Sequence, residues 1–295
     1  MLVLGEALID IVDGPGGESE HVGGSPANVA VGVARQGLPA TLLTRIGRDA
    51  RGARIADHLA AAGVALADAS WTDAATSTAR ATLQPDGSAA YEFDIAWSLA
   101  PPELDGVDLV HTGSIALFLE PGADTVLAAL EAARDAGALV TLDPNIRPAL
   151  VGDADAARDR WDRAARTADL VKLSDEDAAW LYPALGPEEA LAEIAARGPR
   201  IVVMTRGAEG ALALGVDGIQ TVPPMPVTVV DTIGAGDAFM ASLITSLLDD
   251  PDLPSGGAAL GRALRRAAVM AGITVSRAGA QPPTRTEVDR VAHYA

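Results

Sequence analysis

The fold is decided by residues 108–143, which read DLVHTGSIALFLEPGADTVLAALEAARDAGALVTLD. An apolar run of strand length opens the stretch, a helix is expected over 122–136, and a second apolar run, ALVTLD, follows. The same alternation of strand and helix continues as far as residue 205. Alternation of this kind predicts a parallel sheet with helices on both faces. The fold class is therefore α/β, with a doubly wound, mostly parallel sheet.

Flanking segments extend this pattern in both directions. Residues 1–4 form a strand, and GGSPANVAVGVARQG (23–37) predicts a helix in which Ser25 caps and Pro26 takes the first helical position. After residue 205, GALALGV and IQTVPP are expected as edge strands. Two alanine-rich helices, about 235–248 and 256–272, close the chain.

Residues 73–97 break the alternation. TSTARATL (76–83), the turn QPDGS (84–88) and AAYEF (89–93) alternate in the manner of a β-hairpin. This hairpin lacks the apolar run of a buried parallel strand. We therefore expect one domain over residues 1–295 with a small β lid, about 73–97, inserted within it.

Composition and charge narrow the possible partners. The 295 residues are 49% hydrophobic, and no apolar run reaches the ~18 residues of a membrane span. The start, MLVLGEALID, lacks the basic region of a signal peptide, so a cytoplasmic protein is expected. A formal net charge of −18 repels nucleic acid and anionic membranes, and neither is expected as a partner.

Several kinds of site are excluded by residue type. There is no cysteine, so disulfides and thiolate metal sites are ruled out. The four histidines lack metal-ligand spacing: His21, His58, His111 and His293. Lys172 is the only lysine, and neither a P-loop nor the protein-kinase motif set is present.

The stretch DTIGAGDAF (231–239) carries the chemistry. The first N–H groups of a helix lack internal partners, and the helix dipole makes that end positive. Gly234, Ala235 and Gly236 leave space for an anion to approach those groups. Asp237 then lies in the first helical turn, beside the anion. A carboxylate in that position can deprotonate a hydroxyl as it attacks a phosphoryl group.

Other polar residues follow strands of the predicted sheet. Ligands of doubly wound sheets bind beyond the carboxyl ends of the strands. Glu6 and Asp10 follow the first strand, Asp143-Pro144-Asn145 follows LVTL, and Thr205-Arg206-Gly207 follows VVM. We expect the ligand site at this edge.

Seven motifs in order resemble the ribokinase-like, or PfkB, carbohydrate kinase family. DTIGAGDAF is similar to its C-terminal signature, and GGSPANVAVGVARQG is similar to its N-terminal one. The others are RIGRDARG (45–52), TLDPNIRP (141–148), VKLSDEDA (171–178), MTRGAEGA (204–211) and SRAGAQPP (276–283). Together they span nearly the whole chain.

The resemblance implies roles in sugar phosphorylation. Asp237 would be the base that takes the proton of the sugar hydroxyl, and Gly234, Ala235 and Gly236 would form the anion hole. Asp10, Gly24 and Asn28 match positions that bind sugar hydroxyls. Arg147 would point toward phosphate or substrate.

The resemblance also implies ATP and metal ions as cofactors. The residues that match ATP-binding positions are Ser174, Thr205, Gly207, Gly210, Ala267 and Ala271. Asp177 would organise Mg²⁺ through water. A monovalent cation such as K⁺ would lie beside the anion hole, at Asp231, Ile233, Thr274, Arg277 and Gly279. Homodimers formed through the lid occur in this family.

Among family activities, a neutral sugar is favoured as substrate. YEFDIAW (91–97) lacks the arginine that would suit an acid sugar's carboxylate, and GEALIDIV (5–12) is similar to fructokinases. A 2-keto-3-deoxygluconate kinase and a ribokinase or nucleoside kinase stay open as alternatives. A non-catalytic sugar or nucleotide sensor would lack the base. A dinucleotide-dependent oxidoreductase would need GxGxxG after the first strand, whereas GPGGES (14–19) comes too late.

Overall fold

A nine-stranded sheet forms the centre of the computed structural model, which describes residues 1–14, 17–83 and 89–292. Neighbouring strands from β13 to β6 run parallel, and β14 and β15 are antiparallel. This arrangement confirms the predicted class. The strand order is β15 (Gly218–Val222), β14 (Ala211–Gly215), β13 (Ile201–Thr205), β12 (Leu170–Ser174), β11 (Leu139–Asp143), β10 (Leu109–Gly113), β1 (Leu2–Leu4), β4 (Ala40–Leu43) and β6 (Val64–Leu66).

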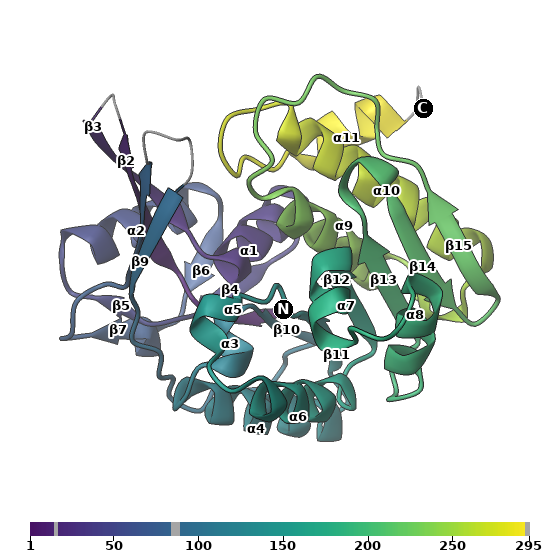
Figure 1. Cartoon of the computed structure of the whole chain (residues 1–295), viewed down its shortest axis with the longest axis horizontal. Coiled ribbons are helices and arrows are strands. Elements are labelled where there is room, and N and C mark those ends of the chain that lie inside the picture. The colour runs from purple at the N-terminus through teal and green to yellow at the C-terminus, as the bar shows by residue number, and fades with distance from the viewer. Residues whose placement is uncertain (15–16, 84–88, 293–295) are drawn as a thin grey trace.

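Helices cover both faces of this sheet (Figure 1). One face packs against α1 (Ser25–Arg35), α9 (Ala235–Asp249) and α10 (Gly257–Val275), and α11 (Arg285–Ala292) lies against α10. The other face packs against α3 (Ile115–Phe118), α4 (Gly122–Asp135), α6 (Ala154–Ala165), α7 (Asp175–Leu181) and α8 (Pro187–Ala195). Two further helices are α2 (Ala50–Ala61) and α5 (Pro148–Val151).

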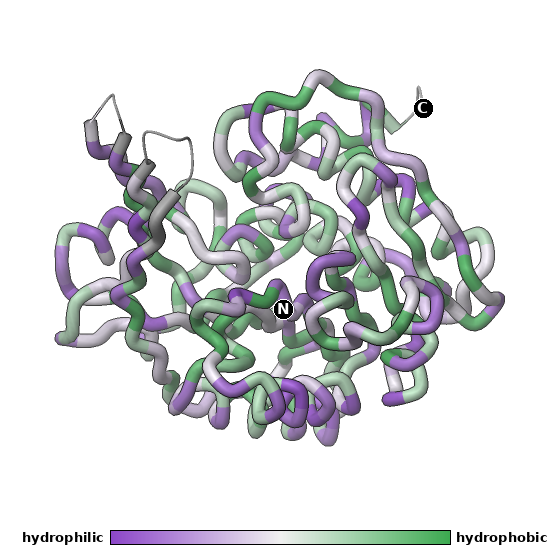
Figure 2. Tube along the Cα trace, in the orientation of Figure 1, coloured by the Kyte–Doolittle hydropathy of each residue, from purple (hydrophilic) through white to green (hydrophobic). Residues whose placement is uncertain are grey.

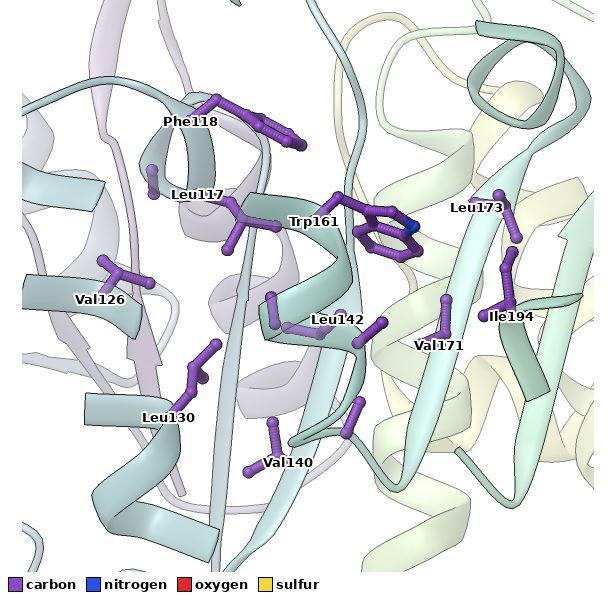
Figure 3. Close-up of a cluster of buried hydrophobic side chains, with 14 of the residues drawn as sticks. Leu117, Phe118, Val126, Leu130, Val140, Leu142, Trp161, Val171, Leu173 and Ile194 are labelled. Carbon is purple, nitrogen blue, oxygen red and sulfur yellow. The ribbon is translucent and has the colours of Figure 1, made fainter. Parts of the chain in front are cut away.

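Buried hydrophobic residues of the described chain form three clusters, and the two that contain strands β11–β13 follow from the period-two geometry of a strand. Successive side chains point to opposite faces, so Leu170 joins the α9–α10 core while Val171 joins the α4–α6 core. Trp161 is fully buried in the latter, beside Leu142 and Leu117 (Figure 3). Hydrophobic residues follow the central strands, and hydrophilic ones mark the outer turns of the covering helices (Figure 2).

A separate four-stranded sheet stands beside the central one, in the order β3, β2, β8, β9 (Figure 1). The strands are β2 (Leu8–Gly14), β3 (Gly17–Gly23), β8 (Thr78–Leu83) and β9 (Ala89–Asp94). The expected lid of residues 73–97 is therefore incomplete, because residues 8–14 and 17–23 supply half of this sheet. The parallel pairing of β2 with β8 joins distant segments, which local patterns do not reveal. The predicted turn QPDGS lies outside the described residues.

The motif RIGRDARG fixes the lid sheet to the body. Asp49 caps α2 by accepting from Gly52 N, and its carboxylate also accepts from the N–H and hydroxyl of Thr76 at 2.9 and 2.8 Å. Thr76 lies just before β8. A short two-stranded sheet, β5 (Ile46–Gly47) with β7 (Trp71–Thr72), lies in the same region. Within the described ranges, no helix has the length and apolar character needed to cross a membrane.

Candidate active site

Asp237 lies buried in the first turn of α9, and α1 holds its carboxylate in place. The Ser25 hydroxyl donates to Oδ1 at 2.6 Å, and the Asn28 amide donates to Oδ2 at 2.8 Å. The prediction that Ser25 caps α1 is wrong, because Gly24 is the N-cap and the Ser25 side chain points to Asp237 instead. Both signatures therefore meet at a single carboxylate.

The start of α9 has the geometry expected of an anion hole. Gly234 is the N-cap in a left-handed conformation, φ 76°, and a side chain there would lie 2.6 Å from the Ala280 Cβ. The N–H of Ala235 already donates to the Thr232 carbonyl at 3.3 Å. The N–H groups of Gly236 and Asp237, in the first turn, have no partner within the helix. These two groups are the donors best suited to an anion.

A buried ion pair lies directly behind this helix start. Lys172, on β12, donates from Nζ to Asp143 Oδ2 at 2.8 Å, and both side chains are at most 5% exposed. A Cβ on Gly236 would lie 2.9 Å from the Lys172 Nζ, so the ammonium faces the glycine. Sequence reasoning used Lys172 only to exclude other kinases. Its place in the middle of a buried strand, where it is the one charged residue of LVKLS, was the signal that could have found it.

The charges of this pair are stable near neutral pH. Burial alone would lower the pKa of Lys172, but the carboxylates of Asp143, Asp237 and Asp177 raise it above its ordinary value. Burial raises the pKa of Asp143 to about 6, against the effect of Lys172. A positive charge therefore remains behind Gly236 at pH 7 and above.

Asp177 and Ser174 form a capping box at the start of α7. The Ser174 hydroxyl accepts from Asp177 N, and Asp177 Oδ2 accepts from Ser174 N, both at 3.0 Å. Asp177 Oδ1 also accepts from Ile146 N at 2.7 Å. Each carboxylate oxygen thus already binds a backbone N–H. Among the described residues no group of three or more acidic or histidine side chains could hold a metal. The water-mediated role of Asp177 stays a prediction, as does ATP binding by Ser174.

The loop after α10 meets the segment before α9, as the cation prediction requires. Asp231 accepts from Ile233 N at 3.0 Å and from Gly279 N at 2.8 Å, and these bonds lower the pKa of its carboxyl. The Thr274 hydroxyl donates to the Met270 carbonyl instead, and Arg277 pairs with Glu287. The structure brings the five residues into one region, and the ion itself stays a prediction.

Asp10 lies on β2, in the lid sheet, rather than in a loop. A side chain on Gly23 would lie 1.9 Å from Asp10 Oδ2, so this glycine makes room for the carboxylate. Gly24 has φ 108°, and a Cβ there would lie 2.4 Å from the Glu6 carbonyl. Burial raises the pKa of Asp10, while His21 and Arg147 lower it. Arg147 is exposed, and its Nη1 donates to Asn145 Oδ1 at 2.7 Å.

The residues predicted to bind ATP differ in how exposed they are. Thr205 is half-buried at the end of β13, and Gly207 is exposed with nothing near its Cβ position. Gly210 packs closely, since a Cβ would lie 2.1 Å from the Val222 carbonyl. Ala271 is half-buried, but Ala267 is fully buried in the core. That Ala267 and Ala271 border adenine stays a prediction.

These features define a class of protein: a phosphotransferase that acts on an alcohol group. A carboxylate held by two donors lies beside N–H groups that have no partner within their helix, and beside a buried cation, which suits deprotonation of a hydroxyl next to a phosphoryl group. The match to the pfkB family carbohydrate kinases covers residues 2–287. The chain belongs to this family.

Similar proteins carry the same activity in their names. The fructokinase of Klebsiella pneumoniae is 39% identical over 256 residues, which is 83% of each chain. The fructokinase of Xylella fastidiosa, solved with bound ATP, has a TM-score of 0.87 at 25% identity and covers 100% of this chain and 98% of its own. A double mutant of the Vibrio cholerae O395 fructokinase, with fructose, ADP and a potassium ion, has a TM-score of 0.85 at 28% identity, over 98% and 97% of the two chains.

Proposed function

We propose that this protein is an ATP-dependent fructokinase, which transfers the γ-phosphoryl group of ATP to a hydroxyl of fructose. The observation that carries the proposal is the Asp237 carboxylate, fixed at 2.6 and 2.8 Å by Ser25 and Asn28 next to the start of α9. Similarity to fructokinases over most of the chain supports the choice of sugar.

The chemistry follows from this arrangement. Asp237 accepts the proton of the attacking hydroxyl, and the N–H groups of Gly236 and Asp237 bind the oxygens of the migrating phosphoryl group. Lys172 adds positive charge behind them. Mg²⁺, carried in with ATP, would neutralise phosphate charge when bound, and Asp177 would orient its water ligands. The ATP dependence fits a cytoplasmic enzyme.

The test is ADP release from ATP and Mg²⁺ over a panel of sugars. Fructose should give the highest kcat/KM among fructose, ribose, tagatose, 2-keto-3-deoxygluconate and nucleosides. A preference for 2-keto-3-deoxygluconate or a nucleoside would replace the fructose assignment while keeping the kinase. No ADP release with any member of the panel would favour a sensor.

Asp10→Ala should weaken the binding and use of the sugar far more than the binding of ATP. A charged hydrogen bond is worth roughly 1.5–3 kcal/mol, so kcat/KM for fructose should fall about 10- to 150-fold, with KM for ATP unchanged. Steady-state kinetics with each substrate varied in turn measures both. Asp13→Ala, three residues further along β2, is the matched control. An unchanged KM for fructose in Asp10→Ala would remove Asp10 from the sugar site.

Potassium should raise the rate above that in sodium or a bulky organic cation. Asp231 ties the loop at Gly279 to the segment before the anion hole, so a cation there would strengthen the hole electrostatically. The measurement is kcat after exhaustive removal of K⁺, in each of the three salts at equal ionic strength. Equal rates would contradict a cation site.

A homodimer through the lid sheet also stays a proposal, and the mass of the protein in solution tests it.

A further inference from the structure

Glu6 is a buried carboxyl that the proposed reaction does not yet use. It lies between β1 and β2, is 5% exposed, and hydrogen bonds with the Ser114 side chain. Its Oε2 atom is buried without a hydrogen-bond partner in the part of the chain that the structure describes. An unpaired polar atom of this kind costs free energy, so its presence requires an explanation.

Backbone strain at Ser114, the hydrogen-bond partner of Glu6, is a second unfavourable feature of this region. Its backbone has φ 53° and ψ −147°, a conformation that residues other than glycine rarely adopt. A side chain on the preceding Gly113 would lie 1.8 Å from the Asp143 carbonyl, so the backbone is packed tightly here. Strain of this type collects at functional sites. The strained Ser114 and the buried Glu6 carboxyl, which are joined by a hydrogen bond, therefore indicate the same functional site.

The charged groups that face Glu6 come from two elements. Arg147, after β11, lowers its pKa, and Asp237, on α9, raises it. From β10–α3 comes the uncharged Ser114, and from the start of α1 comes Gly24, packed on the Glu6 backbone. Arg147 also lowers the pKa of Asp10. One exposed guanidinium thus interacts with both a candidate sugar ligand and this buried carboxyl.

We propose that Glu6 is a positioning residue for phosphoryl transfer, whose carboxylate holds the Arg147 guanidinium over the acceptor sugar. The inference rests on the proposed function. Arg147 Nη1 donates to Asn145 Oδ1, and Glu6 Oε2 has no donor among the described residues. Drawing the guanidinium toward Glu6 gives this oxygen a cationic partner and brings the positive charge between Asp10 and Asp237.

This role makes sugar use depend on pH. Burial is the main cause that raises the pKa of Glu6 from 4.5 to about 7. Below pH 7 the carboxyl holds a proton and loses its attraction for Arg147, so kcat/KM for the sugar falls as pH drops through about 7. Asp143, with a pKa of about 6, contributes a separate decrease of kcat/KM at lower pH.

The same titration acts on stability with the opposite sign. Because the pKa of Glu6 is raised in the folded protein, the contribution of this group to stability is fully present below about pH 4.5 and is lost as pH rises through about 7. Glu6→Gln removes this loss, so its Tm at pH 8 should exceed that of the wild type. A residue that served structure alone would not combine a higher Tm with a lower rate.

The experiment measures kcat/KM for fructose from pH 5.5 to 8.5 at saturating MgATP, with wild type, Glu6→Gln, Arg147→Met and the double variant. Glu6→Gln and Arg147→Met should each lose about tenfold or more at pH 8, the size of one charged hydrogen bond. The double variant should lose no more than either single one. The decrease of kcat/KM near pH 7 should be absent from the three variants, while KM for ATP stays unchanged.

Other outcomes overturn the inference. Losses that multiply in the double variant would mean that Glu6 and Arg147 act separately. A decrease of kcat/KM that persists at higher pH in Arg147→Met, whose exposed position leaves folding intact, would mean that Glu6 acts without Arg147. A wild-type profile in Glu6→Gln would remove Glu6 from the reaction. Failure of the proposed function differs, because no protein in the series would then turn over fructose.

Discussion

Asp237→Asn is expected to slow fructose phosphorylation by about 10²- to 10⁴-fold, the usual value of a positioned general base. The amide cannot accept the proton of the attacking hydroxyl. ATP should still bind, because the proposed anion hole is made of backbone N–H groups at the start of α9. Single-turnover kinetics measures the rate, and calorimetry with ATP measures binding.

Asp249→Asn is the matched control, since Asp249 lies exposed at the other end of the same helix. It should keep the wild-type rate. Ser25→Ala and Asn28→Ala, which each remove one donor to Asp237, should produce smaller losses than Asp237→Asn. A near-normal kcat in Asp237→Asn would contradict the mechanism.

Lys172→Met is expected to lower kcat by about 10²- to 10³-fold, comparable to the loss of one oxyanion donor in other enzymes. The ammonium faces Gly236 from behind, so we expect its charge to act on the phosphoryl group during transfer. The variant also leaves Asp143 buried without its partner. Breaking a buried ion pair in this way costs about 3–5 kcal/mol of stability.

A double variant separates the two effects of Lys172. Lys172→Met with Asp143→Asn removes both charges, so much of the stability should return, while kcat should stay low. Urea unfolding and steady-state kinetics on the same samples measure both. Recovery of kcat together with stability would show that Lys172 supports only the fold.

The sequence by itself determined the fold class, the family and the position of the candidate base, Asp237. Alternating apolar segments such as 108–143 predict strands and helices, because hydrophobic periodicity is a local property of the chain. DTIGAGDAF likewise contains both the glycines of the helix start and Asp237 within nine residues. The signatures also indicated which residues gather at one edge of the sheet.

Only the tertiary structure decided which side chains meet there. Ser25 and Asn28 contact Asp237 across 212 and 209 residues, and Lys172 contacts Asp143 across 29. Half of the lid sheet likewise comes from β2 and β3, of which β2 pairs with β8. Such contacts depend on how separate elements pack. A pattern within one segment fixes the direction of its own side chains, but the partner, the burial and the resulting charge state of Glu6 or Lys172 depend on segments far away in the chain.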